Sequence, residues 1–584
     1  MPPSPTASQK TVREVLAEFD GSFAVVARAI EDGEFALWVG SGISRQAPNL
    51  GNLIEKAFDY IRERAIVAAT ATAYMPAFQE ALTLAEVIPA SVESRFSQPL
   101  AQWPEHDAII NKLWNKYSRV LDLRITGESA DFVLWDAINI RQAFDNPAPP
   151  SSEHLCIAIL VLEGVIRDIA SANWDGFIER AVERLSGGVA GIMQVVVDPN
   201  QLRGPAGRAR LLKFHGCIVY AESEPLVFRQ YLTGSYTQIM GWPEAPAFAA
   251  MCNAVVGLAT NQKTMVLGLS IQDNNLQTLF TRAKQVHAWP WPCAPNAPAH
   301  IFCEDQIQQG QRDVLRLVYG DAYNHSPAAL HEGTLLRAWG EQVLIALVLK
   351  LLTDKLARLM ELGLMAHGKA PLAGPLTASL NRLRDTVADL AVVDPASKSR
   401  TPFVDAAISL WSRMLCLFRT GALPANANGY ETLTSSTLNL LNADQNALAM
   451  GLGHLGLALS LLNDGRDAGH WTLSKPASNN ITSGVLTARS TRADGVDRPV
   501  FVVKSATEAI ALQRSGAFAN DNAIVIHADD AWGFADGTKT ARRVRAAPGR
   551  TGYVGETHIG LSALVADSDN IPALQQRFAS EMIL

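Results

Sequence analysis

The sequence carries few charged residues, and those present leave it slightly acidic. Charged residues make up 18% of its 584 positions, against roughly 25% in an average soluble protein. A formal net charge of −7 argues against a protein that coats nucleic acid, because such a protein needs a basic surface. We therefore expect no direct, sequence-specific binding of nucleic acid.

Paired cysteines and long apolar runs are also lacking. The six cysteines stand singly, with no C-x-x-C pair, so they give neither a disulfide framework nor a structural zinc site. The most apolar run, residues 343–352, is interrupted by Lys350 and is too short to span a bilayer. The opening segment, MPPSPTASQK, has no apolar stretch of the kind found in signal peptides. We expect a soluble, cytoplasmic protein without a membrane span.

Four short apolar segments in the first half are each followed by polar residues or glycine. They are residues 35–39, 167–172, 211–214 and 264–267. Helix-like stretches separate them, an alternation typical of a parallel α/β sheet of Rossmann-like type. Residues from about 66 to 144 have helical periodicity and few strand-like runs, which predicts a helical insertion between the first two core strands.

The pattern changes twice more along the chain. After a lapse at residues 321–333, the chain is rich in Leu and Ala at helical spacing, which predicts a helical layer or small bundle. Towards the end, residues 500–503 and 523–527 have the composition of buried strands, with a helix-like segment at 506–516 between them. We predict an N-terminal segment (1–18), a Rossmann-like domain (19–323), a helical region (334–465) and a small C-terminal α/β unit (466–584).

The most informative segment is GSGIS, which directly follows the first apolar run. It consists of Gly40, Ser41, Gly42, Ile43 and Ser44. Glycines at a strand-to-helix turn let backbone N–H groups approach a pyrophosphate, which a helix N-terminus also attracts. The full G-x-G-x-x-G pattern is absent, because Arg45 occupies its last position. A plain strand-to-helix turn explains this segment about equally well.

Polar residues also end the second and third apolar segments. Asn173 and Asp175 follow the second, where ligand-facing groups of an open α/β sheet collect. Asn and Asp also favour turns for local hydrogen bonding, which is the more common explanation for such a pair. His215 ends the third segment, and a histidine suits acid–base catalysis near neutral pH. A single histidine at a strand end is more often structural.

The fourth segment leads into Gly268, Ser270 and Asp273. The first two are suited to meet a ribose or a phosphate, whereas Asp273 is placed to cap the next helix. Each of the four strand ends has an ordinary structural explanation by itself. Their occurrence in this order is hard to ascribe to chance.

As an ordered set, these segments resemble the sirtuin family, in the divergent form found in bacterial anti-phage defence proteins. GSGIS at 40–44 resembles the family's GAGIS phosphate loop, and SANWD at 171–175 its Asn-x-Asp strand end. FHG at 214–216 resembles the catalytic His-Gly, and GLS at 268–270 with Asp273 the ribose-binding loop. The resemblance covers the predicted domain 19–323 and nothing after it.

The resemblance implies that NAD is the substrate and that Asn173 and His215 are the catalytic residues. Asn173 would orient the ribose hydroxyls or an attacking water, and His215 would accept a proton from either. Asp175 would hold local geometry or share the ribose. The residues at 40–44 and 268–270 would bind the phosphates and the adenosine ribose.

Sirtuins that deacylate proteins carry a four-cysteine zinc module after the His-Gly strand. Here Cys217, Cys252, Cys293 and Cys303 lack the paired spacing that tetrahedral thiolate coordination requires. The resemblance therefore implies an NAD glycohydrolase that needs no metal, releases nicotinamide and ADP-ribose, and depletes NAD during infection. The alternatives are a non-catalytic sensor of NAD or ADP-ribose and, less favoured, a protein deacylase.

The resemblance also implies a partner. Related effectors work beside a HerA-type ring ATPase, or beside a short Argonaute through a β-rich adaptor, and the helical pattern of 334–465 favours the ATPase. Residues 335–365 are apolar on more than one face, which predicts a homo-oligomer unless the region buries this helix in its own core. A basic run forms either a solvated loop or a patch for an acidic partner. It consists of Lys539, Arg542, Arg543, Arg545 and Arg550.

Overall fold

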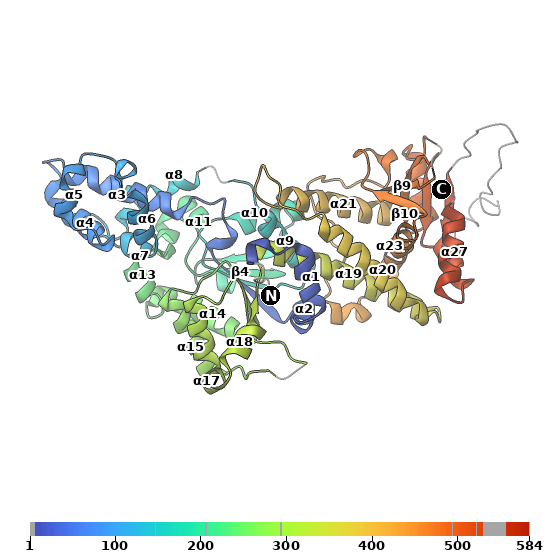
Figure 1. Cartoon of the computed structure of the whole chain (residues 1–584), viewed down its shortest axis with the longest axis horizontal. Coiled ribbons are helices and arrows are strands. Elements are labelled where there is room, and N and C mark those ends of the chain that lie inside the picture. Colours follow the sequence, from blue (N-terminus) through green and yellow to red (C-terminus); the bar gives the residue numbers. More distant parts are fainter. Residues whose placement is uncertain are drawn as a thin grey trace.

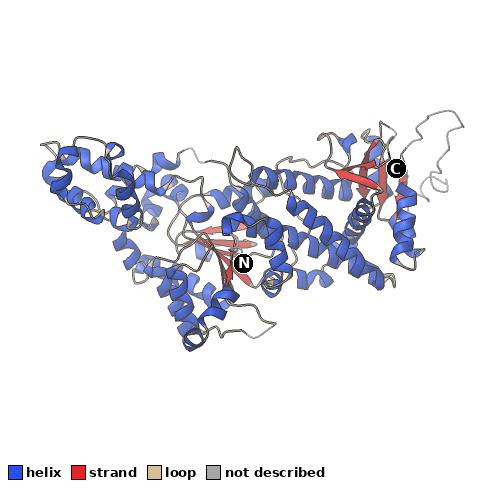
Figure 2. Cartoon of the chain, viewed as in Figure 1, coloured by secondary structure: helices blue, strands red, loops and turns tan. Residues whose placement is uncertain are grey.

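The computed structural model describes residues 6–145, 148–204, 207–292, 295–492, 495–520, 522–529 and 556–582. Two sheets lie apart along an elongated molecule, each surrounded by helices (Figure 1, Figure 2). The seven-stranded sheet occupies the middle, and the five-stranded sheet lies near one end. A group of helices from the first quarter of the chain forms the opposite end (Figure 1).

The central sheet is parallel throughout, with strand order β3-β4-β2-β1-β5-β6-β7. After β1 the chain builds the strands on one side of the sheet, β2, β3 and β4. After β5 it builds those on the other side, β6 and β7. In an open α/β sheet, a ligand crevice forms outside the carboxyl ends of the strands at such a point. The strands are β1 (Phe35–Val39), β2 (Asp168–Ser171), β3 (Met193–Val196), β4 (Ala209–Lys213), β5 (Lys263–Leu267), β6 (His300–Cys303) and β7 (Leu335–Leu336).

Helices cover both faces of this sheet, so alternate residues of a strand enter different cores. In β1, Phe35 and Leu37 belong to one buried cluster and Trp38 to the other, where its ring lies 4.8 Å from that of Phe280. One face packs on α1 (Val12–Asp20), α2 (Ala24–Glu31), α9 (Ser152–Leu162), α10 (Phe177–Ser186) and α19 (Gly340–Ala366); the other packs on α14 (Ala249–Asn261), α15 (Asn274–Val286), α16 (Gln309–Tyr319) and α18 (Pro327–Thr334). The predicted Rossmann-like fold is confirmed.

The helical insertion is also confirmed, and its helices begin with α3, earlier than expected. It has a buried cluster of its own, to which residues from the segment after β4 contribute. Its helices are α3 (Leu50–Ala65), α4 (Ala71–Leu84), α5 (Pro89–Val92), α6 (His106–Trp114), α7 (Tyr117–Val120) and α8 (Ile140–Phe144).

The helical region shares its core with the central sheet. The strand β7 comes after the expected limit at residue 323, so the sheet takes its edge strand from the start of this region. The long helix α19 packs against α1 and α9, and also against the helices that follow it. The following helices that contact α19 are α20 (Ala373–Asp389) and α23 (Leu452–Asp467), whereas α21 (Thr401–Thr420) packs against α9.

Most of the apolar surface of α19 is buried within the chain itself. Within the stretch 335–365, which the sequence shows to be apolar on more than one face, the buried residues include Val343, Leu344, Leu347, Val348, Leu351 and Leu352. Because α1, α9, α20 and α23 cover them, this helix no longer gives a reason to expect self-association.

A buried ion pair joins the end of α9 to α19. Lys355 has no exposed side-chain surface and donates to the Glu163 carboxylate at 2.8 Å and to the carbonyls of Glu163 and Thr434. The other carboxylate oxygen of Glu163 accepts from the Tyr430 hydroxyl at 2.8 Å and from the Leu433 N–H at 2.7 Å. Every charged group here is paired, as burial requires.

The C-terminal unit is a mixed sheet with order β12-β11-β10-β9-β8. The neighbours β10 and β11, and β11 and β12, are parallel, whereas β8 and β9, and β9 and β10, are antiparallel. The predicted strand-helix-strand unit corresponds to β10, α24 and β11. The basic run at 539–550 lies outside the described residues. No helix of the described part is long and apolar enough to cross a membrane. The elements are β8 (Trp471–Ser474), β9 (Leu486–Ser490), β10 (Asp497–Val503), α24 (Ala506–Arg514), β11 (Ile524–His527), β12 (Thr557–Gly560), α26 (Leu561–Ala566) and α27 (Ile571–Met582).

Candidate active site

The turns after β1 and β5 pack backbone against backbone at the carboxyl edge of the sheet. The N–H of Gly40 donates to Leu267 O at 3.1 Å, and the N–H of Gly42 donates to Gly268 O at 3.0 Å. A Cβ on Gly42 would lie 2.6 Å from the Cα of Gly268, which itself has a φ of +61°. These two positions therefore require glycine, and the two turns form one unit.

This packing changes how the first turn can meet a phosphate. The N–H groups of Ile43 and Ser44 donate to Gly40 O and Ser41 O, so together with Gly40 and Gly42 four of its N–H groups are engaged inside the protein. The predicted contact through the glycine amides is therefore not offered by this geometry. The exposed surface of the turn consists of Ser41 and Gly42.

Arg45 follows this turn and is exposed. The turn runs into a short 3-10 helix, Ser41–Ile43, and α3 begins only at Leu50. The helix N-terminus is thus separated from the glycines, and Arg45 is the positively charged group on the intervening segment.

Asn173 is buried against the same turn, at the end of β2. Its Nδ2 donates to Gly40 O at 3.1 Å and to Ser44 Oγ at 3.0 Å, which uses both hydrogens of the amide. None of the described residues donates to Oδ1. Asn173 therefore presents a hydrogen-bond acceptor to anything that enters the crevice.

His154, in the first turn of α9, is a member of this cluster that the sequence reasoning missed. Its Nε2 lies 3.1 Å from Ser44 Oγ, and its Nδ1 accepts from the Ser151 N–H at 3.2 Å. Burial, with a contribution from Arg180, lowers the pKa of His154 to about 3. The ring is neutral with its proton on Nε2, so it donates to Ser44 and holds the hydroxyl beside Asn173.

His215 lies at the end of β4 and is 4% exposed. Burial lowers its pKa to about 4, so the ring is neutral at physiological pH. Its Nε2 lies 3.0 Å from the Nδ2 of Asn275 in α15. Asn275 was not predicted as a site residue, although it follows the fourth strand end closely in the sequence.

Asp175 and Lys213 lie beside these strand ends and hold the segment after β2 in place. The Asp175 carboxylate accepts from the Phe177 N–H at 3.1 Å at the start of α10, a local turn contact. Lys213 is 1% exposed and donates to Glu179 Oε1 at 2.8 Å and to Asp175 O. Burial lowers the pKa of Lys213, but Glu179 and other neighbours outweigh burial and raise it. This buried cation, which the sequence reasoning missed, fixes the segment after Asn173.

The predicted capping role of Asp273 is wrong. Asp273 occupies the N-cap position of α15, but its side chain accepts no capping hydrogen bond. Instead it faces the hydroxyl of Tyr117 at 3.4 Å, and burial raises its pKa. Tyr117 belongs to α7, so the insertion reaches the turn after β5. Ser270, between Gly268 and Asp273, is half-buried.

A comparison with known families gives a match to the central part of this domain. Residues 167–290 match the SIR2-like domain. The match runs from β2 into the segment after α15 and includes Asn173, His215 and Gly268, while the turn at 40–44 precedes it. A SIR2-like domain is consistent with NAD-related catalysis. No curated protein gives a significant match to the chain.

One further acid lies at the same edge of the central sheet. Glu304 directly follows β6, and burial raises its pKa to about 7, with Gln311 acting in the opposite direction. The Gln311 amide also donates to Leu269 O at 3.2 Å, which connects this acid to the turn after β5. The sequence reasoning missed Glu304 because β6 was not predicted.

The cysteines that were considered for a zinc site lie in separate elements. Cys217 follows β4, Cys252 lies in α14 and Cys303 ends β6, while Cys293 lies outside the described residues. Within the described part of the chain, no three His, Cys, Asp or Glu side chains are arranged to hold a metal ion.

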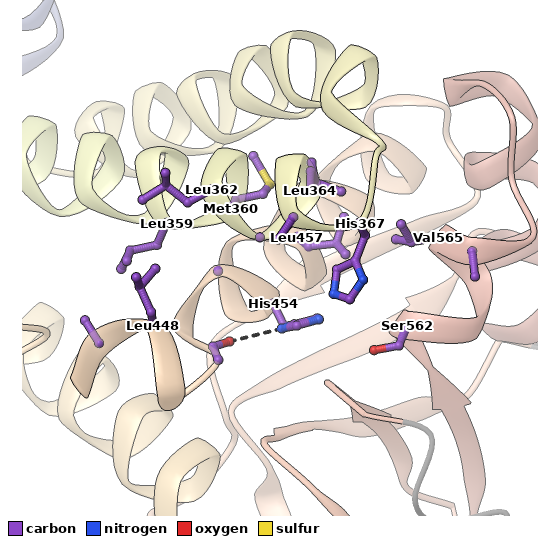
Figure 3. Close-up of a pocket in the computed structure, with 16 residues that line it drawn as sticks. Leu359, Met360, Leu362, Leu364, His367, Leu448, His454, Leu457, Ser562 and Val565 are labelled. Carbon is purple, nitrogen blue, oxygen red and sulfur yellow. Dashed lines mark hydrogen bonds between the residues drawn. The ribbon is translucent and has the colours of Figure 1, made fainter. Parts of the chain in front are cut away.

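A cavity of about 480 Å³ lies elsewhere, between α19, the start of α23 and α26. Figure 3 shows a mainly aliphatic wall that includes the imidazoles of His367 and His454. His454 Nδ1 donates to Gly451 O at 3.3 Å. None of the residues that line this cavity belongs to the group around Asn173 and His215, so the cavity is not part of the candidate active site.

Proposed function

We propose that this chain is an NAD glycohydrolase that releases nicotinamide and ADP-ribose. The observation that carries the proposal is the acceptor of Asn173, held against the turn at 40–44 by Gly40 O and Ser44 Oγ, in a domain that also places His215 at a neighbouring strand end. A protein that only binds NAD does not need this pair of polar groups. The match to a SIR2-like domain supports NAD as the ligand.

The chemistry needs little acid catalysis. The bond between C1′ of the ribose and the nicotinamide nitrogen breaks with its electron pair leaving on nicotinamide, which departs as a neutral base. Water then adds to the oxocarbenium carbon, and its proton passes to solvent or to a base. The site has to hold the ribose, limit access of other water and stabilise the developing positive charge.

Asn173 is suited to orient the attacking water or a ribose hydroxyl, because its free atom is an acceptor with partial negative charge. Ser44 and, behind it, His154 fix the direction of this amide. His215 is neutral and largely buried, so it contributes a hydrogen bond rather than a charge. The exposed Ser41 and Arg45 are the groups of the first turn that face outward to the phosphates.

The remaining parts of the proposal rest on the resemblance to defence sirtuins and on the sequence pattern of residues 334–465. They are an anti-phage role, activation by a HerA-type ATPase rather than a short Argonaute, and self-association. The burial of α19 within one chain removes one reason for self-association, and native mass measurement of the full chain tests what is left.

The test is chromatography of nicotinamide and ADP-ribose formed from NAD by the full chain, with and without an acetyl-lysine peptide. Release that does not depend on the peptide supports the proposal. Release that requires the peptide would point to a deacylase, and binding of NAD without release would point to a sensor. Asn200→Ala, at an exposed position after β3, is the matched control for Asn173→Ala.

A further inference from the structure

The orientation of the His215 ring is determined by Asn275. The Leu276 N–H donates to Asn275 Oδ1 at 2.8 Å, so this oxygen is the acceptor of the amide. The other amide atom, Nδ2, is therefore the one that lies 3.0 Å from His215 Nε2. An amide nitrogen only donates, so Nε2 must accept with its lone pair. In a neutral imidazole the proton then lies on Nδ1.

The surroundings keep the ring in this state. Asn275 is 1% exposed and His215 4% exposed, so water cannot readily replace either partner. No charged side chain adds to the effect of burial on His215, although Lys213, Asp175 and Asp273 belong to neighbouring strand ends. Protonation of Nε2 would set an N–H against the N–H of Asn275. None of the described residues bonds to Nδ1.

We propose that Asn275 is a positioning residue that holds His215 as the Nδ1–H tautomer, with Nε2 covered. His215 then enters the site as a hydrogen-bond donor, and it accepts a proton on Nε2 only after the bond to Asn275 breaks. This role deepens the proposed NAD cleavage and rests on it. With Asn173 as the acceptor, the site offers one donor and one acceptor, a pair that complements a hydroxyl group of ribose.

The tautomer is measurable without any reaction. The full chain labelled with ¹⁵N-histidine gives long-range ¹⁵N–¹H correlations that distinguish the two tautomers, and His215→Ala identifies the His215 signals. We expect a protonated Nδ1 and an unprotonated Nε2 between pH 5.5 and 8. A His215 ring protonated on Nε2 in the wild-type chain would overturn the proposal, and this result needs no variant to fold.

Asn275→Asp supplies the opposite partner at nearly the same size. A carboxylate accepts from the ring, so the proton should move to Nε2 and His215 should titrate at least one pH unit higher. Gln277→Glu, at a half-buried position of the same helix, adds the same charge on a different face and should leave the tautomer unchanged. An unchanged tautomer and titration in a folded Asn275→Asp chain would overturn the proposal.

Turnover adds a second readout. We expect the wild-type rate of nicotinamide release to be nearly constant between pH 5.5 and 8, and the Asn275→Asp rate to fall at least tenfold, with a new acidic limb and a change mainly in kcat. A chain that shows the Nδ1–H tautomer but never releases nicotinamide would defeat the proposed function alone. Nicotinamide release with identical pH profiles in both proteins would defeat the role of Asn275 alone.

Discussion

Replacing Gly42 by alanine tests the contact between the two turns on which the candidate site is built. An added Cβ would lie 2.6 Å from Gly268 Cα and 3.0 Å from Gly268 O. Both atoms belong to the backbone, so no side-chain rotation relieves the overlap. Moving the turn away breaks the hydrogen bond from Gly42 N–H to Gly268 O.

The size of the effect follows from these contacts. Overlap in a well-packed region costs about 1–3 kcal/mol, and the broken hydrogen bond adds about 1 kcal/mol. The turn also carries Gly40 O, which accepts from Asn173 at 3.1 Å. A displacement of about 1 Å in a positioning group can reduce turnover about 100-fold. We therefore expect Gly42→Ala to lower kcat/KM by about 100-fold and the free energy of unfolding by about 2–4 kcal/mol.

Other glycines separate overlap from backbone strain. Gly188 has a φ of +78° with nothing within 4 Å of an added Cβ, so Gly188→Ala carries the strain alone, about 1–2 kcal/mol. Gly268→Ala combines a φ of +61° with a Cβ 2.7 Å from Gly42 Cα and should be at least as damaging as Gly42→Ala. Gly257 in α14 has open space, and Gly257→Ala should be neutral or slightly stabilising.

The assay combines nicotinamide release with thermal unfolding of each full-length variant. Wild-type kinetics and an unchanged melting temperature for Gly42→Ala would refute the close packing of the two turns. Equal loss of activity in Gly188→Ala would attribute the effect to general instability instead.

The remaining predictions concern catalysis, a buried charge and pH. Asn173→Ala and His215→Ala should each reduce nicotinamide release at least about 100-fold in a chain that stays folded, and near-normal turnover in either would remove that residue from catalysis. Lys355→Met should lower the free energy of unfolding, measured by urea titration, by about 3–5 kcal/mol, because Glu163 then keeps an unpaired buried charge. Adding Glu163→Gln should restore part of this loss. A Lys355→Met chain as stable as the wild type would contradict the prediction. Burial lowers the pKa of His300 to about 3, so below pH ~6.5 the unfolded state binds more protons than the folded state. The free energy of unfolding therefore falls as the pH drops below this value, by at most about 1.4 kcal/mol per pH unit for this group. His300→Leu should show a shallower slope between pH 4.5 and 7, and an identical slope would disprove the contribution of His300.

The strands that the sequence revealed are those with a continuous apolar run. The segment at 35–39 is β1 itself, since all its residues are buried between two helical layers. By contrast, β3 reads MQVV and is half-buried at the sheet edge, so it lacks such a run. The edge strand β7 has only two residues, too few for any periodicity to show.

Within the candidate site, Asn173 and His215 were predicted from their places at strand ends together with the family resemblance that the ordered set of segments carries. Their partners could not be selected in this way. His154 lies in a buried helix far from Ser44 in sequence, and only the packing of α9 brings it there. The local sequence around Asp273 predicts a helix cap, but the hydroxyl of Tyr117, which belongs to the insertion, donates to the Asp273 carboxylate instead. Tertiary contacts decide each of these cases.

The helix α9 explains why the chain beyond residue 323 cannot be treated as a separate module. All eleven of its residues are buried, so it spans about 16 Å without a solvent-facing side. Its first turn carries His154, which contacts Ser44, and its end carries Glu163, whose charge is balanced by Lys355 of α19. A chain cut near residue 323 would lose Lys355 and the cover of α9, and would leave Glu163 as an unpaired buried charge. Loss of assembly in such a fragment would therefore report misfolding, so the contribution of the C-terminal half to assembly has to be measured with surface substitutions in the full chain.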